Sequence, residues 1–105
     1  MDIDILGTKY LIEYKDVSEY ERLENNEAIT NTNNKTITMS KRERPQGYTN
    51  KILRHEIIHA FLYESGLSCN SYNTDYGWAE CEEMVDWFAI QSPKIFEVFK
   101  KLDLL

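Results

Sequence analysis

The stretch NKILRHEIIHAFLYES, residues 50–65, decides how the rest of the chain is read. Its apolar side chains recur every three or four residues, which is the spacing of one face of an α-helix. Thr49 or Asn50 can cap the start of this helix, and Gly66 supplies a stop at its end. We therefore predict a helix from about Asn50 to Ser65 that is buried along one side.

His55 and His59 lie four residues apart in this helix, so their rings project from one face about 6 Å apart along the axis. Neutral imidazole nitrogen is a common zinc ligand, and zinc prefers four ligands in a tetrahedron. Glu56 can reach a water on such an ion without binding the ion, which suits a general base. No other histidine occurs in the chain, which argues against a chance pair of packed or surface histidines. The pattern predicts a metal site that needs a third protein ligand.

A second stretch with helical period, residues 78–91, offers carboxylates for the third position. Glu82 and Asp86 share one face a turn apart, so one can bind the ion while the other accepts the free N–H of a ligand histidine. Glu83 points about 100° away around the helix and is expected in solvent. We choose Glu82 as the ligand and predict a zinc ion held by His55, His59 and Glu82.

Alternatives for the third ligand remain open. Glu80 is another acidic candidate, and a thiolate of Cys81 or Cys69 could replace the carboxylate. The metal is open as well, because imidazole and carboxylate also suit manganese, iron or cobalt. A tyrosine hydroxyl near the metal could stabilise a developing oxyanion, and Tyr72 and Tyr76 are the candidates.

These residues resemble those of the gluzincins, in which a helical His-Glu-x-x-His is completed by a glutamate from a later helix. More closely, Glu82-x-x-Val85-Asp86-x-Phe88-Ala89 is similar to the Glu-x-x-Ala-Asn-x-Phe-Ala segment of ImmA/IrrE-type peptidases and the small phage-encoded proteins related to them. Val and Asp stand in place of Ala and Asn. The resemblance covers about residues 35–91. The sequence contains no counterpart of the helix-turn-helix module that some members of that group carry.

The resemblance implies a zinc-dependent metallopeptidase that hydrolyses peptide bonds with metal-activated water and Glu56 as general base. It also implies a minimal zincin-like fold, with the metal site between the first two long helices. In such families an edge strand lies above the site and pairs with an extended substrate. Here that strand would be residues 37–40, and the partner would be a peptide or protein substrate.

The remaining segments predict an α+β domain in which a small N-terminal β-sheet precedes three α-helices. Residues 3–14 are β-prone around a turn at Gly7-Thr8, and residues 35–40 alternate polar and apolar as a half-buried strand does, which fits a sheet edge. Residues 17–34 are polar and are interpreted as a connection. Ser92-Pro93 predicts the end of the second helix and the start of the third.

The aromatic residues of the C-terminal third are predicted to belong to the core, because most aromatic side chains serve packing. These residues are Trp78, Trp87, Phe88, Phe96 and Phe99.

Length and charge limit the other possibilities. A chain of 105 residues suits a single domain, residues 1–105. The formal net charge of -6 argues against nucleic-acid binding, and no apolar run is long enough to span a membrane. Two cysteines without a secretory leader predict a reducing compartment, by default the cytoplasm. We expect a monomer or a weak homodimer.

Two rival functions remain open. The chain can be a zinc-stabilised binding or regulatory module with little or no catalytic activity, since metal binding can supply folding energy. It can also be a latent peptidase whose C-terminal residues 100–105 block the site. Packing of this end on the core is the preferred interpretation of the same residues.

Overall fold

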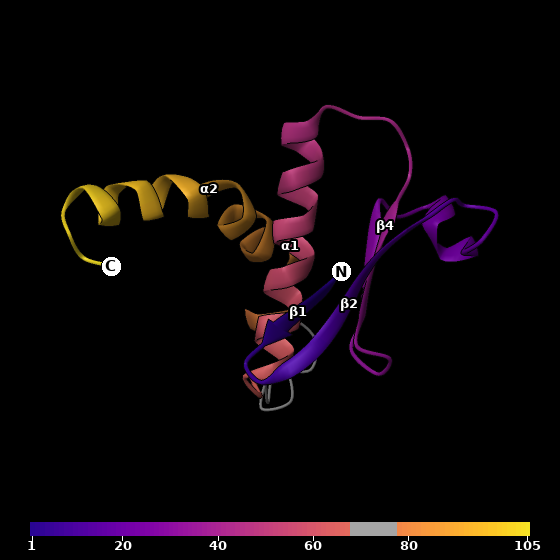
Figure 1. Ribbon diagram of the computed structural model, residues 1–105, viewed down its shortest axis with the longest axis horizontal. Coiled ribbons are helices and arrows are strands. Elements are labelled where there is room, and N and C mark those ends of the chain that lie inside the picture. Colours follow the sequence, from indigo (N-terminus) through magenta and orange to yellow (C-terminus); the bar gives the residue numbers. More distant parts are fainter. Residues whose placement is uncertain (68–77) are drawn as a thin grey trace.

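A computed structural model describes residues 1–67 and 78–105. In these residues one four-stranded sheet is followed by two long helices, so the predicted α+β class is confirmed (Figure 1). The elements are β1 (Asp2–Ile5), β2 (Thr8–Lys15), the 3-10 helix η1 (Glu21–Glu24), β3 (Ala28–Asn31), β4 (Thr36–Ser40), α1 (Gln46–Glu64), the 3-10 helix η2 (Trp78–Glu80) and α2 (Glu82–Lys101).

The strand order in the sheet is β1-β2-β4-β3. β2 and β4 are parallel, whereas β1 pairs with β2 and β3 pairs with β4 in antiparallel fashion. The β structure predicted around a turn in residues 3–14 is confirmed and is a hairpin, but its turn is Leu6-Gly7, because Ile5 already pairs with Thr8. Both turn residues have positive φ, 51° and 90°, which matches the right-handed twist of the two strands.

β3 corrects two predictions from the sequence. It lies inside residues 17–34, which were expected to be a connection, and it occupies the sheet edge that was assigned to residues 35–40. β4 instead lies between β2 and β3 and is buried along Ile37–Ser40. Four residues are too few to show a strand period, and strand formation here depends on pairing with β4 rather than on local propensity.

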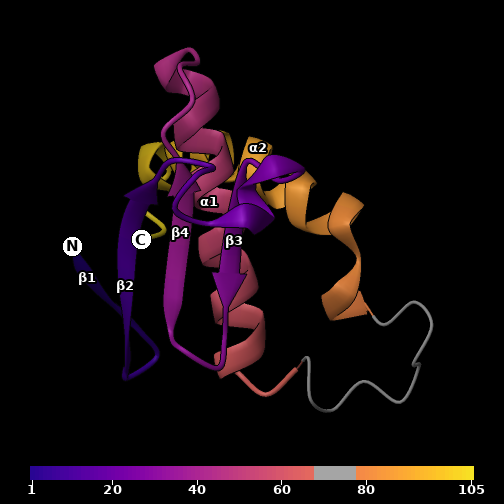
Figure 2. The same ribbon diagram turned by 90° about the vertical axis from the view of Figure 1, so that its right-hand side faces the viewer.

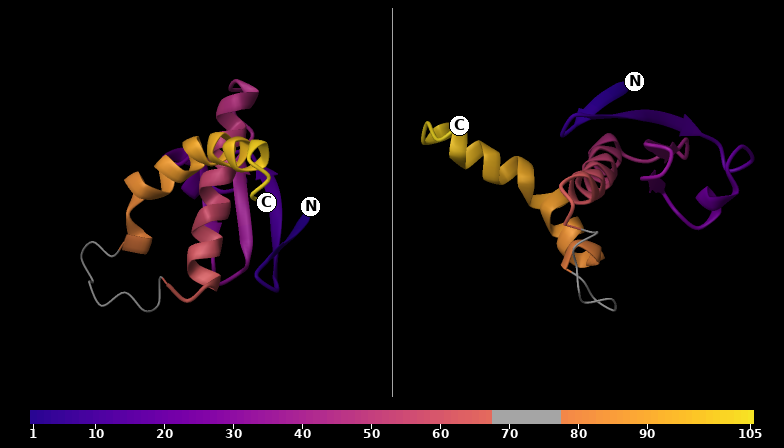
Figure 3. Two further views of the ribbon diagram at one scale, coloured as in Figure 1. Left: turned by 90° about the vertical axis from the view of Figure 1, so that its left-hand side faces the viewer. Right: turned by 90° about the horizontal axis from the view of Figure 1, so that it is seen from below.

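The core lies between one face of the sheet and α1. Its buried cluster contains Ile5, Tyr10, Ile12, Ile37 and Met39 from the strands with Ile52 and Ala60 from the helix. α1 lies on one face of the sheet and runs alongside β3 and β4, and α2 packs on α1 from the side away from the strands (Figures 2 and 3). α1 is therefore the middle layer and can present side chains in both directions.

The start of α1 differs from the prediction, whereas its end agrees. The helix begins at Gln46, directly after Pro45 and four residues earlier than expected, without a side-chain cap. At the other end the N–H of Gly66 donates to the carbonyl of Tyr63 over 3.0 Å. Gly66 has a φ of 84°, a conformation that glycine adopts without steric cost.

The prediction of three helices is wrong, because α2 continues from Glu82 to Lys101 through Pro93. A proline inside a helix has no N–H for the carbonyl four residues before it, which here belongs to Ala89. That carbonyl accepts a hydrogen bond from Arg54 Nε of α1 over 2.6 Å. A side chain from the neighbouring helix thus replaces the missing backbone donor.

The C-terminal half of α2 projects beyond α1 and lies away from the sheet (Figure 1). The expected core role of the aromatic residues is therefore wrong for Trp87, Phe88, Phe96 and Phe99, whose exposed fractions are 52%, 37%, 54% and 38%. The side chain of Trp78 lies outside the description. Neither helix in the described ranges is long and apolar enough to cross a membrane.

Candidate metal centre

The two histidines of α1 approach each other closely. His55 Nε2 and His59 Nε2 are 3.1 Å apart, and the two ring centroids are separated by 4.8 Å. Both side chains are mostly buried, with exposed fractions of 15% and 21%. This proximity follows from the spacing of four residues, which puts both rings on the α2 side of α1.

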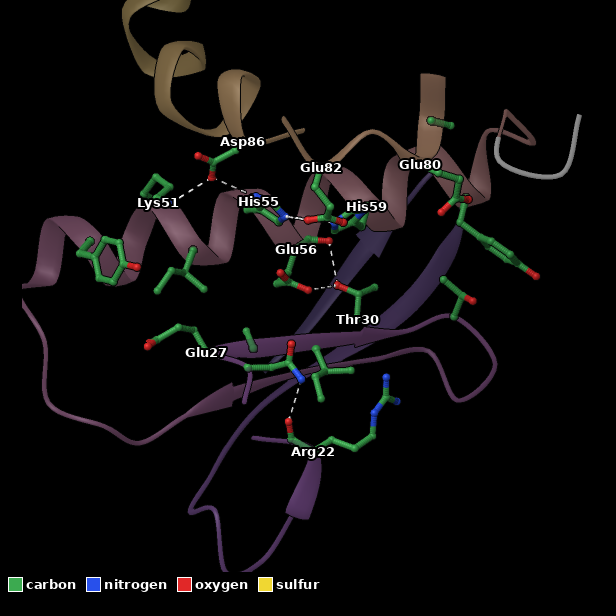
Figure 4. Close-up of a pocket in the computed structure, with 18 residues that line it drawn as sticks. Arg22, Glu27, Thr30, Lys51, His55, Glu56, His59, Glu80, Glu82 and Asp86 are labelled. Carbon is green, nitrogen blue, oxygen red and sulfur yellow. Dashed lines mark hydrogen bonds and ion pairs between the residues drawn. The ribbon is translucent and has the colours of Figure 1, made fainter. Parts of the chain in front are cut away.

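Glu82, the first residue of α2, bridges the two histidines. Its Oε2 atom lies 2.9 Å from His55 Nε2, and its Oε1 atom lies 2.9 Å from His59 Nε2 (Figure 4). The structure thus brings together the three residues that the sequence predicted as metal ligands. Glu82 is 69% exposed, so solvent and small ions can reach this side of the cluster.

The spacing of the three donor atoms can be compared with the need of a zinc ion. For bonds of roughly 2.0–2.1 Å at tetrahedral angles, neighbouring ligand atoms lie about 3.3–3.4 Å apart. Here the two imidazole nitrogens are 3.1 Å apart, and each lies 2.9 Å from a different oxygen of Glu82. With one ligand atom taken from each residue, the three atoms lie within 4.8 Å of one another. Glu82 is exposed and can turn one oxygen toward both nitrogens, so the donor set fits a tetrahedral cation.

Hydrogen bonding around His55 also indicates a positive centre. Its Nδ1 atom lies 3.2 Å from Asp86 Oδ1, and an ionised carboxylate only accepts hydrogen bonds. Nδ1 therefore carries the proton in a neutral ring, and Nε2 directs a lone pair toward the Glu82 carboxylate. Two acceptors facing each other repel unless a proton or a metal ion lies between them.

Asp86 is held by a second partner, Lys51. Lys51 Nζ lies 3.0 Å from Asp86 Oδ1. The hydrogen bond from Lys51 lowers the pKa of Asp86, and that from His55 contributes in the same direction. The carboxylate stays ionised and keeps the His55 ring in one tautomer. The sequence predicted this support for a ligand histidine but not the contribution of Lys51.

Glu56 points from α1 toward the edge strand rather than toward α2 (Figure 4). Its carboxylate oxygen Oε1 lies 2.8 Å from the hydroxyl of Thr30 on β3, and the same hydroxyl lies 3.1 Å from the backbone carbonyl of Glu56. Glu56 is only 9% exposed. Thr30 was missed because residues 17–34 were interpreted as a connection. The one local signal, the β-prone pair Ile29-Thr30, is too short to show a strand period.

A cleft of about 710 Å³ joins these groups. It lies between α1, the edge strand β3 and the beginning of α2, and is lined by both histidines, Glu56, Thr30, Glu82 and Asp86. β3 therefore borders the site, and the expectation that residues 37–40 do so is wrong. Residues 100–105 are exposed and do not line this cleft, so the preferred interpretation that this end packs on the core is wrong, and the segment does not block the site either.

The alternative ligands have different outcomes. Glu80 lines the cleft but is outside the three-residue cluster, and Glu83 is exposed as expected. Cys81 is exposed and does not join the cluster either. The suggestions concerning Cys69, Tyr72 and Tyr76 fall outside the described residues.

Comparisons with known proteins leave the site to be interpreted on its geometry. No protein-family model, no curated protein and no solved structure matches this chain.

Proposed function

We propose that this chain is a zinc-dependent metallopeptidase of the gluzincin kind, with a minimal zincin-like arrangement of sheet and helices. The observation that supports the proposal best is the convergence of His55, His59 and Glu82 within a solvent-accessible cleft that also contains Glu56. Two imidazoles and one carboxylate are a donor set of catalytic zinc, which keeps its fourth position open.

Each residue has a defined task in this proposal. Zinc held by the three ligands would polarise a peptide carbonyl and lower the pKa of a coordinated water toward ~7. Glu56 accepts the proton from the attacking water and returns it to the departing amine. Asp86 orients His55 and fixes its tautomer, as partners of ligand histidines commonly do.

A peptide substrate is supported by the position of β3. This strand pairs with β4 along one side and forms the edge of the sheet along the other. An extended peptide can add to such an edge through main-chain hydrogen bonds. The cleft runs beside Ala28–Thr30 of this strand, so a peptide bound there would pass the candidate metal centre. We place this activity in the cytoplasm, on peptides or unfolded proteins.

The first test is metal content. We expect purified wild-type protein to carry one zinc ion per chain, and His59→Ala or Glu82→Ala to lose it, because two remaining ligands hold zinc poorly. Glu80→Ala is the matched control, since Glu80 lines the same cleft and is not in the cluster. Zinc retained by Glu82→Ala but lost by Glu80→Ala would reject the assignment of the third ligand.

The second test separates binding from chemistry. We expect Glu56→Gln to retain zinc and to lower hydrolysis of an unfolded protein substrate by about 10²–10⁴-fold, the usual contribution of a general base. The control is Glu83→Gln, which removes an exposed acid next to Glu82 and should leave the rate unchanged. Full activity of Glu56→Gln would remove the mechanism.

A zinc-stabilised module with little or no catalytic activity is the second candidate. It is favoured by the origin of the ligands, because Glu82 of α2 bridges two side chains of α1, so a bound ion would link the two helices. Chelation distinguishes the two functions. Loss of helix packing on chelation, together with no hydrolysis by the zinc-loaded wild type, would favour the module.

A further inference from the structure

We infer that Thr30 is a positioning residue of the candidate active site, which orients the carboxylate of Glu56. The inference rests on the proposed function, in which Glu56 transfers protons. It concerns a residue of the edge strand that lies outside the His-Glu-x-x-His segment and outside the glutamate helix.

The contact itself has two parts. The Thr30 hydroxyl lies within hydrogen-bond distance of both the Oε1 atom and the backbone carbonyl oxygen of Glu56. One hydroxyl hydrogen is shared between these two acceptors. The side-chain end and the backbone of Glu56 are therefore tied to one atom, which limits the torsions available between them.

The anchor is rigid because of where Thr30 lies. Thr30 is in β3 and pairs with Ile37 of the interior strand β4. The side chain of Ile37 is fully buried. Thr30 is also β-branched, so its χ1 torsion is restricted. A hydroxyl on such a residue moves less than one on a loop, and it can hold the Glu56 carboxylate in one place.

The carboxylate needs this donor. Glu56 is buried, and within residues 1–67 and 78–105 its carboxylate has no hydrogen-bond donor other than the Thr30 hydroxyl. A buried carboxylate without a partner is costly, so it would turn away from β3 toward solvent. The proposed proton transfer needs the carboxylate to stay in one place beside the cleft.

The test replaces Thr30 by valine in the zinc-loaded protein. Valine keeps the shape and the strand preference of threonine and removes only the hydroxyl. We expect kcat to fall about 10- to 100-fold, the cost of displacing a catalytic group by an ångström or so. KM and zinc content should stay the same, because substrate pairing and the three ligands are untouched. Thr30→Ser should recover most of kcat.

Thr38→Val is the matched control. Thr38 is a buried threonine on the neighbouring strand β4, and its hydroxyl also bonds a carboxylate, that of Glu13, over 3.0 Å. Neither Thr38 nor Glu13 lines the cleft. The control therefore loses an equivalent hydrogen bond without touching Glu56, and we expect its kcat to equal that of the wild type.

A measurement without turnover complements the kinetics. In metal-free protein, Thr30→Val should lower the urea midpoint of unfolding. In a Glu56→Ala background the same change should have a smaller effect, because the carboxylate is gone and only the backbone carbonyl of residue 56 remains as an acceptor. Equal effects in both backgrounds would overturn the contact with the carboxylate.

The outcomes separate the two proposals. If the wild type hydrolyses the substrate and Thr30→Val keeps its kcat, or if Thr30→Ser fails to recover activity that Thr30→Val has lost, the positioning role is wrong and the proposed function stands. If the zinc-loaded wild type is as inactive as Glu56→Gln, both proposals fail together.

Discussion

Glu64, the last residue of α1, joins the helix to β2 and to the turn before β4. Its carboxylate accepts hydrogen bonds from Thr8 and Tyr10 of β2 over 3.1 and 2.7 Å, and from Lys35 over 2.7 Å. These partners lie 29 to 56 residues away in the sequence. The four residues hold the end of α1 against the sheet, on whose face the helix presents Glu56.

This cluster makes stability depend on pH. The hydrogen bond from Lys35, followed by those from Tyr10 and Thr8, lowers the pKa of Glu64. A carboxyl group with a lowered folded-state pKa stabilises the protein above its unfolded pKa, which is about 4.3. This stabilisation is lost as the pH falls from there through the folded-state pKa.

We therefore expect Glu64→Gln to flatten the acid side of the stability profile. The variant should be less stable than the wild type at pH 7, and the difference should shrink as the pH falls from about 5 toward 3. Urea unfolding at several pH values measures it. Glu83→Gln, which alters an exposed acid, is the control. If the difference in stability between the two proteins did not change with pH, the effect of Glu64 would come from its shape and not from its charge.

At the scale of the elements, the sequence predicted a helix or strand correctly where the complete periodic pattern lies within one short segment. α1 and the hairpin were found because their periods repeat within a few residues. The convergence of Glu82 with His55 and His59 was also predictable. Two of these residues share one helix face, and the third lies on the same face as Asp86 of the next helix.

The errors have a common physical cause, which is that the deciding partner is distant in the sequence. β3 forms against β4, and Thr30 acquires its role only through that pairing. Ser92-Pro93 is a valid local signal for a helix boundary, yet the helix continues. Arg54, 35 residues before Ala89, supplies the donor that Pro93 lacks.

This compensation can be measured with a double-mutant cycle. We expect Arg54→Met, which keeps an apolar stem, to reduce the free energy of unfolding by about 1.5–3 kcal/mol, the range for a hydrogen bond to a charged group. In a Pro93→Ala background the loss should be smaller, because residue 93 then has an N–H for the carbonyl of Ala89. Urea unfolding of the four proteins gives the coupling energy. Identical losses in both backgrounds would show that Arg54 does not compensate for the proline.

At the scale of the whole molecule, the layers end at different places. α1 is covered by the sheet on one side and by the first turns of α2 on the other, whereas the C-terminal half of α2 extends past both (Figure 3). Its large apolar side chains, among them Phe96 and Phe99, are partly exposed. The core therefore depends on residues of the sheet and α1 and little on the last turns of α2.

Two substitutions of large apolar residues should therefore differ strongly in cost. We expect Phe96→Ala to change the free energy of unfolding by less than about 1 kcal/mol, because the ring is half exposed. Ile37→Ala should cost about 2–5 kcal/mol, because Ile37 is fully buried between β2 and β3. Chemical unfolding at neutral pH measures both. A cost for Phe96→Ala as large as that for Ile37→Ala would mean that the end of α2 is covered in solution.

The division of the candidate ligands between α1 and α2 has a consequence for protein synthesis. A ribosome that has made residues 1–64 has incorporated the sheet residues, both histidines and Glu56, but not Glu82, which completes the set. The nascent chain therefore stays without its full set of ligands until α2 has emerged. If the proposed activity is correct, a nascent chain that has not yet reached Glu82 cannot hydrolyse its neighbours on the polysome.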